Sequence, residues 1–217
     1  MIRELIGSEY PMLRLYCMRH AESEANVLKV FSNRDPSIHP LTERGVSQAE
    51  AAAKRLAAIP FDRIYTSDLL RARQTAAIIA ARCGVEVIPS ARLREHDAGV
   101  LEGRSDPAAW AEYNALVRSW FVYHRIDERI EGGESLDDLR RRLFTFIEAL
   151  RISYAGHTAN VLLVGHGGLF MSGLPLLLDN LSYDYVTAHL LRYCDVAVAE
   201  WHGSGWTCIE WAGRRPL

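Results

Sequence analysis

Short apolar runs alternate with amphipathic segments along most of this chain. Residues 13–18 and 160–164 are nearly continuous apolar runs, which is typical of strands buried on both faces of a parallel sheet. Between these runs, apolar residues at helical spacing predict helices that begin after Thr42, Asp68 and Ser135. The alternation predicts an α/β fold: a three-layer sandwich with a mostly parallel central sheet flanked by helices.

Shorter segments complete this prediction. Gly84 is expected to end the second helix in a left-handed conformation. Strands are expected at residues 63–66, 85–88, 195–201 and 206–211, and an apolar helix at about 169–178. The buried face of the helix that follows Thr42 is predicted to hold Val46, Ala49, Ala53, Leu56 and Ala57.

Residues 100–134 break the alternation. They contain several aromatic residues and scattered arginines, and we interpret them as a helical and loop insertion that lies over the edge of the sheet. No linker is visible elsewhere, so residues 1–217 are expected to form a single domain with 100–134 as a cap-like insertion. The aromatic residues of this segment include Trp110, Tyr113, Trp120, Phe121 and Tyr123.

The composition fits one globular domain. With 217 residues, of which 49% are hydrophobic and 24% charged, the chain can bury a sizeable core. A net charge of −2 offers no general attraction for nucleic acid or an anionic membrane, so neither is expected as a partner. Residues 1–9 carry acids and lack a continuous apolar stretch, which argues against a signal peptide, and no run is long enough to span a bilayer. The expected compartment is the cytoplasm.

The cysteines and most of the histidines show no metal-site pattern. The cysteines have no partner at the two- to four-residue spacing of zinc sites, so we interpret them as small buried residues, and a disulfide stays open. No metal site is predicted. These cysteines are Cys17, Cys83, Cys194 and Cys208, and the histidines without a metal-like neighbour are His39, His124, His157, His189 and His202.

Two histidines stand where predicted strands end. Arg19 and His20 follow the first apolar run, and His166 follows the second, within Gly165-His166-Gly167-Gly168. An arginine-histidine pair occurs by chance in many proteins, but two such strand ends can converge. In open α/β sheets, ligands bind outside the carboxyl ends of the strands, and a guanidinium fork suits phosphate. The sequence therefore predicts a local anion site.

Five blocks of residues resemble the histidine phosphatase (phosphoglycerate mutase-like) superfamily in order and spacing. Together they cover roughly residues 13–170, and five blocks in sequence are far more specific than any one of them. The blocks are Arg19-His20-Ala21-Glu22-Ser23-Glu24-Ala25-Asn26, Pro40-Leu41-Thr42-Glu43-x-Gly45-x-x-Gln48-Ala49, Thr66-Ser67-Asp68-Leu69-x-Arg71-Ala72-x-x-Thr75-Ala76, Glu95, and Gly165-His166-Gly167-Gly168.

The resemblance implies a phosphohistidine mechanism. His20 would be the nucleophile that attacks phosphorus and forms a covalent intermediate, which water then hydrolyses. Arg19 and Arg71 would hold the phosphoryl group and, as like charges, keep His20 unprotonated. His166 would donate to a phosphoryl oxygen, and Glu95 would serve as the general acid and base.

Further residues are expected to contact the phosphate or shape its pocket. Asn26 through its amide, and more weakly Ser32, would bind substrate, as would the backbone N–H groups of Gly167 and Gly168 at a helix start. Two residues next to these blocks have structural interpretations. His96 is a candidate for lining the pocket, and Glu22 is expected to tie down its loop.

The predicted function is a metal-independent phosphomonoesterase that acts on a small phosphorylated metabolite and needs no cofactor. Phosphatase is favoured over mutase because residues 96–99 read His-Asp-Ala-Gly where phosphoglycerate mutases have arginine-histidine-tyrosine-glycine, and no proline-rich segment with arginine follows. Ala21 also replaces the usual glycine, a small change. The aromatic insertion is the expected source of substrate selectivity. Arginines expected near the pocket mouth are Arg94, Arg104, Arg118, Arg125 and Arg129.

Other classes of protein remain as alternatives. Two alternative functions stay open: a cofactor-dependent phosphoglycerate mutase, and a phospho-ligand or phosphoprotein-binding module of the same fold with weak activity. A homodimer also stays open as the oligomeric state. An α/β-hydrolase or a P-loop enzyme is not expected, because Gly-x-Ser-x-Gly and Gly-x-x-x-x-Gly-Lys are both missing from the sequence.

Overall fold

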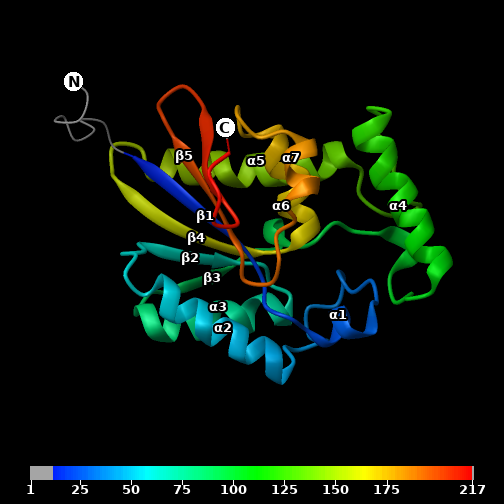
Figure 1. Cartoon of the computed structure of the whole chain (residues 1–217), viewed down its shortest axis with the longest axis horizontal. Coiled ribbons are helices and arrows are strands. Elements are labelled where there is room, and N and C mark those ends of the chain that lie inside the picture. The colour runs from blue at the N-terminus through cyan, green and yellow to red at the C-terminus, as the bar shows by residue number, and fades with distance from the viewer. Residues whose placement is uncertain (1–11, 217) are drawn as a thin grey trace.

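A six-stranded sheet forms the centre of the computed structural model, which describes residues 12–216 (Figure 1). Its strand order is β3-β2-β4-β1-β5-β6. The first four strands along the chain run parallel, whereas β5 is antiparallel to β1 and β6 is antiparallel to β5. The predicted α/β fold with a mostly parallel sheet is confirmed. The strands are β1 Leu13–Arg19, β2 Arg63–Thr66, β3 Val87–Pro89, β4 Ala159–Gly165, β5 Val196–Trp201 and β6 Trp206–Trp211.

Helices cover both faces of this sheet. On one face, α2 (Glu43–Leu56) and α3 (Leu70–Cys83) pack on alternate residues of β1 and β4, among them Met18 and Leu162. The other face is covered by α5 (Leu136–Ser153), α6 (Gly167–Gly173) and α7 (Tyr183–Ala188). The remaining elements are α1 (Glu24–Leu28), α4 (Pro107–Val122) and 3₁₀ turns at Ala91–Leu93, Gly99–Leu101 and Leu174–Leu176.

Local capping explains where the helices begin and end. The Thr42 hydroxyl accepts from the N–H of Gly45 at 2.9 Å, and Ser135 forms a capping box with Asp138 at the start of α5. Gly84 ends α3 with φ of 69°, a left-handed conformation that costs glycine nothing. These predicted helix ends are confirmed.

The buried face of helix α2 is rotated from the predicted one. Ala49, Ala53 and Leu56 are buried, but Val46 is 38% exposed and Ala57 is exposed. The helix turns this way because Gly45 packs directly on the Glu22 backbone, where a Cβ would overlap the carbonyl group. That contact joins α2 to the loop that follows β1.

Two further element boundaries differ from the predictions. The apolar segment 169–178 forms α6 from Gly167 and then a 3₁₀ turn, because Pro175 has no N–H to continue an α-helix. Strand β3 begins at Val87 rather than at residue 85. Neither change alters the layers.

The insertion at 100–134 lies at the carboxyl ends of the parallel strands rather than over an edge strand (Figure 1). It is attached by a separate apolar cluster, in which Trp120 and Leu116 of α4 pack with Phe31 and Leu136. The insertion consists of helices and loops, as predicted. Its cap-like role stays a prediction.

Other predictions from the sequence have simple outcomes. All four cysteines are unpaired, and all but Cys83 are buried, as interpreted. Within residues 12–216, no helix has the length and apolar character needed to cross a membrane. The prediction about a signal peptide concerns residues 1–9, which lie outside the described part of the chain.

Candidate active site

Parallel pairing of β1 and β4 brings the two predicted histidines together. Arg19 pairs in register with Gly165, so His20 and His166 each follow at the same end of the sheet. The N–H of His20 donates to the Gly165 carbonyl at 2.9 Å, and the two imidazole rings lie 5.0 Å apart between centroids. Residues almost 150 positions apart in the chain thus share one site.

His20 presents one ring nitrogen to the site and holds the other on its own backbone. Its Nδ1 lies 2.6 Å from the carbonyl oxygen of Ala21, which can only accept, so Nδ1 carries the proton. The lone pair of Nε2 accepts from Nε of Arg71 at 3.2 Å. Burial, then the charges of Arg71 and Arg19, lowers the pKa of His20 well below its ordinary value, despite the opposing bond to Ala21. His20 is therefore neutral, with its lone pair directed at a cation.

Arg71 connects His20 to the loop that holds the predicted residue Ser32 and also Asn33, which sequence reasoning missed. It lies in the first turn of α3, where Nη1 donates to the Ser32 carbonyl at 2.8 Å and Nη2 donates to Oδ1 of Asn33 at 3.2 Å. Burial lowers the pKa of Arg71 to about 10, against the raising effect of nearby carboxylates, so the guanidinium stays charged at neutral pH. The Asn33 amide in turn donates to the His96 carbonyl at 2.8 Å, which holds the loop in place.

His166 lies behind His20 and is fully buried. Its Nδ1 is 3.4 Å from Nη2 of Arg71, and its Nε2 is 2.8 Å from the Ser67 hydroxyl. A guanidinium only donates, so Nδ1 is the acceptor and Nε2 holds the proton. Burial, followed by the charge of Arg71, lowers the pKa of His166 well below its ordinary value. Ser67, at the end of β2, therefore orients this ring, although sequence reasoning assigned it no such role.

These buried neutral histidines predict a stability that depends on pH. Unfolded histidines titrate near pH ~6.5, so below that pH the unfolded chain takes up protons that folded His20 and His166 refuse. The free energy of unfolding should fall as pH drops from about 6.5 toward their folded pKa, by up to ~1.4 kcal/mol per pH unit for each histidine. Urea unfolding at a series of pH values across this range measures the free energy of unfolding. His166→Asn should flatten the dependence and the exposed His157→Asn should not; equal slopes in wild type and His166→Asn would contradict the assignment.

Arg19 has an unsatisfied donor next to the same pocket. Its Nη1 donates to the Leu191 carbonyl at 2.8 Å, and its guanidinium lies 4.6 Å from the ring centroid of Tyr193. Its Nε is buried and has no acceptor among residues 12–216; it lies beside Gly167, where a Cβ would come within 3.2 Å of it. A buried N–H without a partner is costly, so an anion that accepts from it is favoured.

Glu95 caps the start of α6. Its Oε2 accepts from the N–H of Gly168 at 2.8 Å, and Oε1 accepts from Leu169 at 2.6 Å and His96 at 3.0 Å. The sequence predicts the Gly168 N–H as a phosphate donor; in this structure that N–H donates to the Glu95 carboxylate, and a phosphate contact there stays a prediction. The contact needs glycine, since a Cβ at Gly168 would lie 2.6 Å from Oε1.

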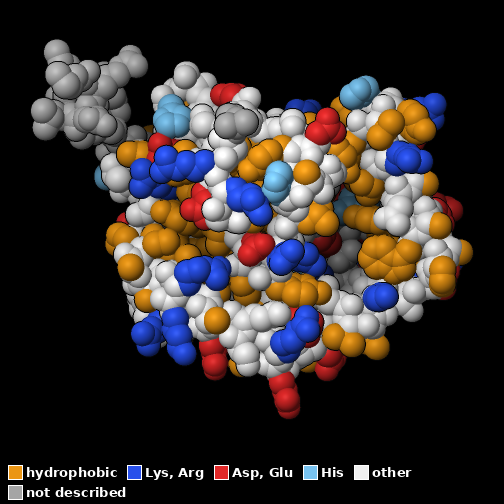
Figure 2. Space-filling view, viewed as in Figure 1, with side chains coloured by type: hydrophobic (Ala, Val, Ile, Leu, Met, Phe, Trp, Pro, Cys, Tyr) orange, Lys and Arg blue, Asp and Glu red, His pale blue; other side chains and the backbone are white. Residues whose placement is uncertain are grey.

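A cavity of about 150 Å³ opens beside these groups, where Figure 2 shows the surface hollowed between α4 and the end of the sheet. The side chain of Asn26 reaches it, but Oδ1 already accepts from the Ser23 N–H and hydroxyl, each at 3.0 Å. The Ser32 hydroxyl is 2.7 Å from Nδ1 of His39. The lining includes the predicted residues Arg19, His20, Asn26, Ser32, Arg71, Glu95 and Gly167, together with Asn33, Trp110 and Tyr113.

Some predicted pocket residues lie elsewhere. His96 does not line the cavity: it is buried beneath α4, with Nε2 2.7 Å from the Glu134 carbonyl and its ring edge on Trp120. Glu22 accepts from the Thr42 hydroxyl and pairs with Arg44, so it does tie down its loop. None of the five arginines expected at the mouth lines the cavity, and those paired with carboxylates are Arg94, Arg104, Arg125 and Arg129.

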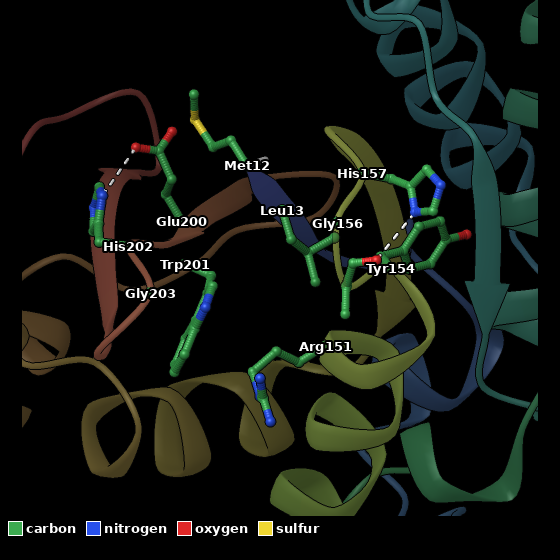
Figure 3. A pocket seen from close by; sticks show the side chains of 11 residues that line it. Met12, Leu13, Arg151, Tyr154, Gly156, His157, Glu200, Trp201, His202 and Gly203 are labelled. Atoms are coloured by element: carbon green, nitrogen blue, oxygen red, sulfur yellow. Dashed lines mark hydrogen bonds and ion pairs between the residues drawn. The ribbon is translucent and has the colours of Figure 1, made fainter. Parts of the chain in front are cut away.

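A second cavity lies at the opposite end of β1 (Figure 3). It measures about 540 Å³, and its lining includes Leu13, Arg151, Tyr154 and Trp201. No predicted site residue belongs to it. Among residues 12–216, no group of three or more histidine, cysteine, aspartate or glutamate side chains is arranged to hold a metal ion. The converging histidines and arginines therefore mark the carboxyl-end cavity as the candidate active site.

Comparisons with known proteins agree on one family. The model of the histidine phosphatase superfamily (branch 1) matches residues 15–213. A probable phosphoglycerate mutase GpmB from Klebsiella pneumoniae is 35% identical over 207 residues, covering 92% of this chain and 90% of that protein. The solved mycobacterial glucosyl-3-phosphoglycerate phosphatase superposes with a TM-score of 0.78 at 26% identity, over 94% of this chain and 100% of that one. An alpha-ribazole phosphatase from Shigella flexneri superposes with a TM-score of 0.73 at 25% identity, over 94% of this chain and 98% of that one.

Proposed function

The chain belongs to branch 1 of the histidine phosphatase superfamily, and from that premise we propose that it is a metal-independent phosphomonoesterase acting through a phosphohistidine. One observation carries the proposal: His20 is neutral, its Nδ1 proton is held by Ala21, and its Nε2 lone pair faces the pocket beside Arg71. An imidazole in this state is a nucleophile that needs no separate base. Relatives named as phosphatases of small phosphorylated metabolites support the substrate class.

In the first step, Nε2 of His20 attacks phosphorus, and the bond from phosphorus to the ester oxygen breaks. The phosphoryl group enters between Nε2 and Arg71, so that the guanidinium exchanges its bond to the ring for bonds to phosphoryl oxygens. Arg19, whose buried Nε lacks a protein acceptor, supplies further charge, and donors preset for a developing charge contribute most to such reactions. His166, joined to Arg71, acts on the same side of the pocket.

Glu95 is proposed to protonate the leaving alkoxide and then to take a proton from the water that cleaves the phosphohistidine. It lines the cavity with His20, which supports this role. Both of its oxygens accept backbone N–H groups here, so the acid step requires a protonated Glu95 that gives up one of those bonds. Hydrolysis returns His20 to its starting state and releases phosphate.

The phosphatase is preferred to the mutase because the residues after Glu95 are committed to structure. His96 is buried under α4, and Asp97 pairs with Arg34 and accepts from the N–H of Gly99 at 2.9 Å. Neither residue lines the cavity beside His20. A mutase is the second candidate, since the curated relative is named a probable phosphoglycerate mutase.

A panel of phosphorylated metabolites assayed with EDTA tests this function. We expect phosphate release that EDTA leaves unchanged, and an acid-labile phosphoenzyme when labelled substrate is quenched. Glu95→Gln should lower kcat for alkyl phosphates by roughly 10²–10⁴-fold, but much less for 4-nitrophenyl phosphate, whose leaving group needs no proton. The exposed Glu112→Gln on α4 is the matched control. Phosphoryl transfer between phosphoglycerates that outpaces hydrolysis would instead establish the mutase.

A further inference from the structure

The cavity beside His20 continues outward into a second, larger chamber. The two share Arg19, Ala25, Asn26, Val30 and Trp110, so they form one passage from the surface to the nucleophile. We call the outer part the outer chamber, and its remaining lining residues are Lys29, Ser105, Pro107 and Tyr193. A substrate whose phosphorus is at His20 must place its leaving group here.

The two parts of the passage differ in size. The inner cavity measures about 150 Å³, which suits a phosphoryl group, whereas the outer chamber measures about 540 Å³. Chambers of roughly 300–1,000 Å³ hold ligands of many atoms. A three-carbon acid would leave most of the outer chamber filled with water.

Two aromatic side chains in the outer chamber are held rigidly. Trp110 stacks on Phe31 with ring centroids 4.4 Å apart, and its Nε1 donates to the Lys29 carbonyl at 2.8 Å. Tyr193 lies against the guanidinium of Arg19. Fixed rings offer apolar contact area at little entropic cost, and flat ligand faces pack well on them.

The charge of the outer chamber is positive. Lys29 and Arg19 belong to its lining, and no carboxylate of residues 12–216 does. The acids nearest in sequence are turned to other partners: Asp106 caps α4 and pairs with Arg104. This lining favours a neutral or anionic leaving group over a cationic one.

We propose that the outer chamber binds the leaving group by stacking on Trp110, and that the preferred substrates are phosphomonoesters of ring-bearing alcohols, such as sugars and nucleosides. The inference rests on the proposed phosphatase function. The shared chemistry of these substrates is a flat ring face a short distance from the ester oxygen. The insertion, through α4, thus supplies the residue that selects substrate.

The test compares a phosphate ester that carries a ring with one that has none, and the alcohols of the two esters have similar acidity. For the wild-type enzyme, kcat/KM should be at least about tenfold higher for 2-phenylethyl phosphate than for ethyl phosphate. Glucose 6-phosphate and adenosine 5′-phosphate, set against glycerol 3-phosphate and 3-phosphoglycerate, distinguish a sugar from a nucleoside.

Variants of α4 assign the preference to one side chain. Trp110→Ala should remove the tenfold preference for the ring-bearing ester, and Trp110→Phe should keep most of that preference. Tyr123→Ala, an aromatic residue of the same insertion that is 58% exposed and outside the chamber, should behave as wild type.

The outcomes distinguish failure of this inference from failure of the proposed phosphatase function. Equal kcat/KM values for ring-bearing and acyclic esters in the wild type would overturn the inference and leave the phosphatase intact, and that comparison needs no variant to fold. A preference that survives in folded Trp110→Ala would also overturn it. Failure to hydrolyse any of these esters would instead contradict the proposed function.

Discussion

His20→Ala is expected to lower kcat for phosphomonoester hydrolysis by about 10⁴-fold or more, the scale on which other enzymes lose activity with their nucleophile. The reason is specific to this site: among residues 12–216, His20 is the one histidine that lines the cavity, and His166 is fully buried with its Nδ1 facing Arg71. Steady-state phosphate release measures the loss. The variant should also take up no acid-labile label from substrate.

The exposed His157→Ala is the control for this prediction, since it removes an imidazole far from the cavity. A second readout separates catalysis from folding. His20 is buried with a lowered pKa, so removing it should make the free energy of unfolding less sensitive to acid rather than more. Undiminished turnover in a folded His20→Ala enzyme would show that the phosphoryl group does not pass through this side chain.

The positions of the two histidines could be predicted because they follow from strand pairing. Apolar runs buried on both faces identify β1 and β4, and residues that follow parallel neighbours share one end of a sheet. The helix faces were less predictable. Val46 fits the helical period of α2, but the contact of Gly45 with the Glu22 backbone rotates it into solvent.

The partners of the catalytic groups were not predictable in the same way. Asn33 and Ser67 belong to loops, where no periodicity marks the side chain that turns inward. The contact of Glu95 with the N–H groups of α6 depends on how the segment before α4 packs. Short-range patterns located the candidate reacting residues, whereas the residues that orient them are defined by tertiary packing.

Burial explains how such a site can keep two histidines neutral among cations. His20 and His166 lie where water does not stabilise an imidazolium, and Arg71 adds like charge to both. In the proposed mechanism the same guanidinium therefore has two functions: it binds phosphate and it keeps the nucleophile neutral. A variant that separates these functions should be more informative than deletion of the residue.

Arg71→Lys is expected to lower kcat by roughly 10²–10³-fold, the range seen when a preset donor to a developing charge is lost. Lysine keeps a charge but cannot donate at once to His20, Ser32 and Asn33, as the planar guanidinium does. Arg71→Met removes the charge as well. In that variant the pKa of His20 should rise toward its ordinary value, because one of the cations that lowers it is gone.

The pH dependence of kcat/KM and an NMR titration of His20 measure this difference. With Arg71→Met, the acidic limb of the pH profile should move to higher pH, since His20 would take up a proton sooner on acidification. The exposed Arg73→Met, two residues along α3, is the matched control and should change neither kcat nor the titration. An unchanged His20 pKa in Arg71→Met would mean that burial alone keeps the nucleophile neutral, and Arg71 would then act only on the phosphoryl group.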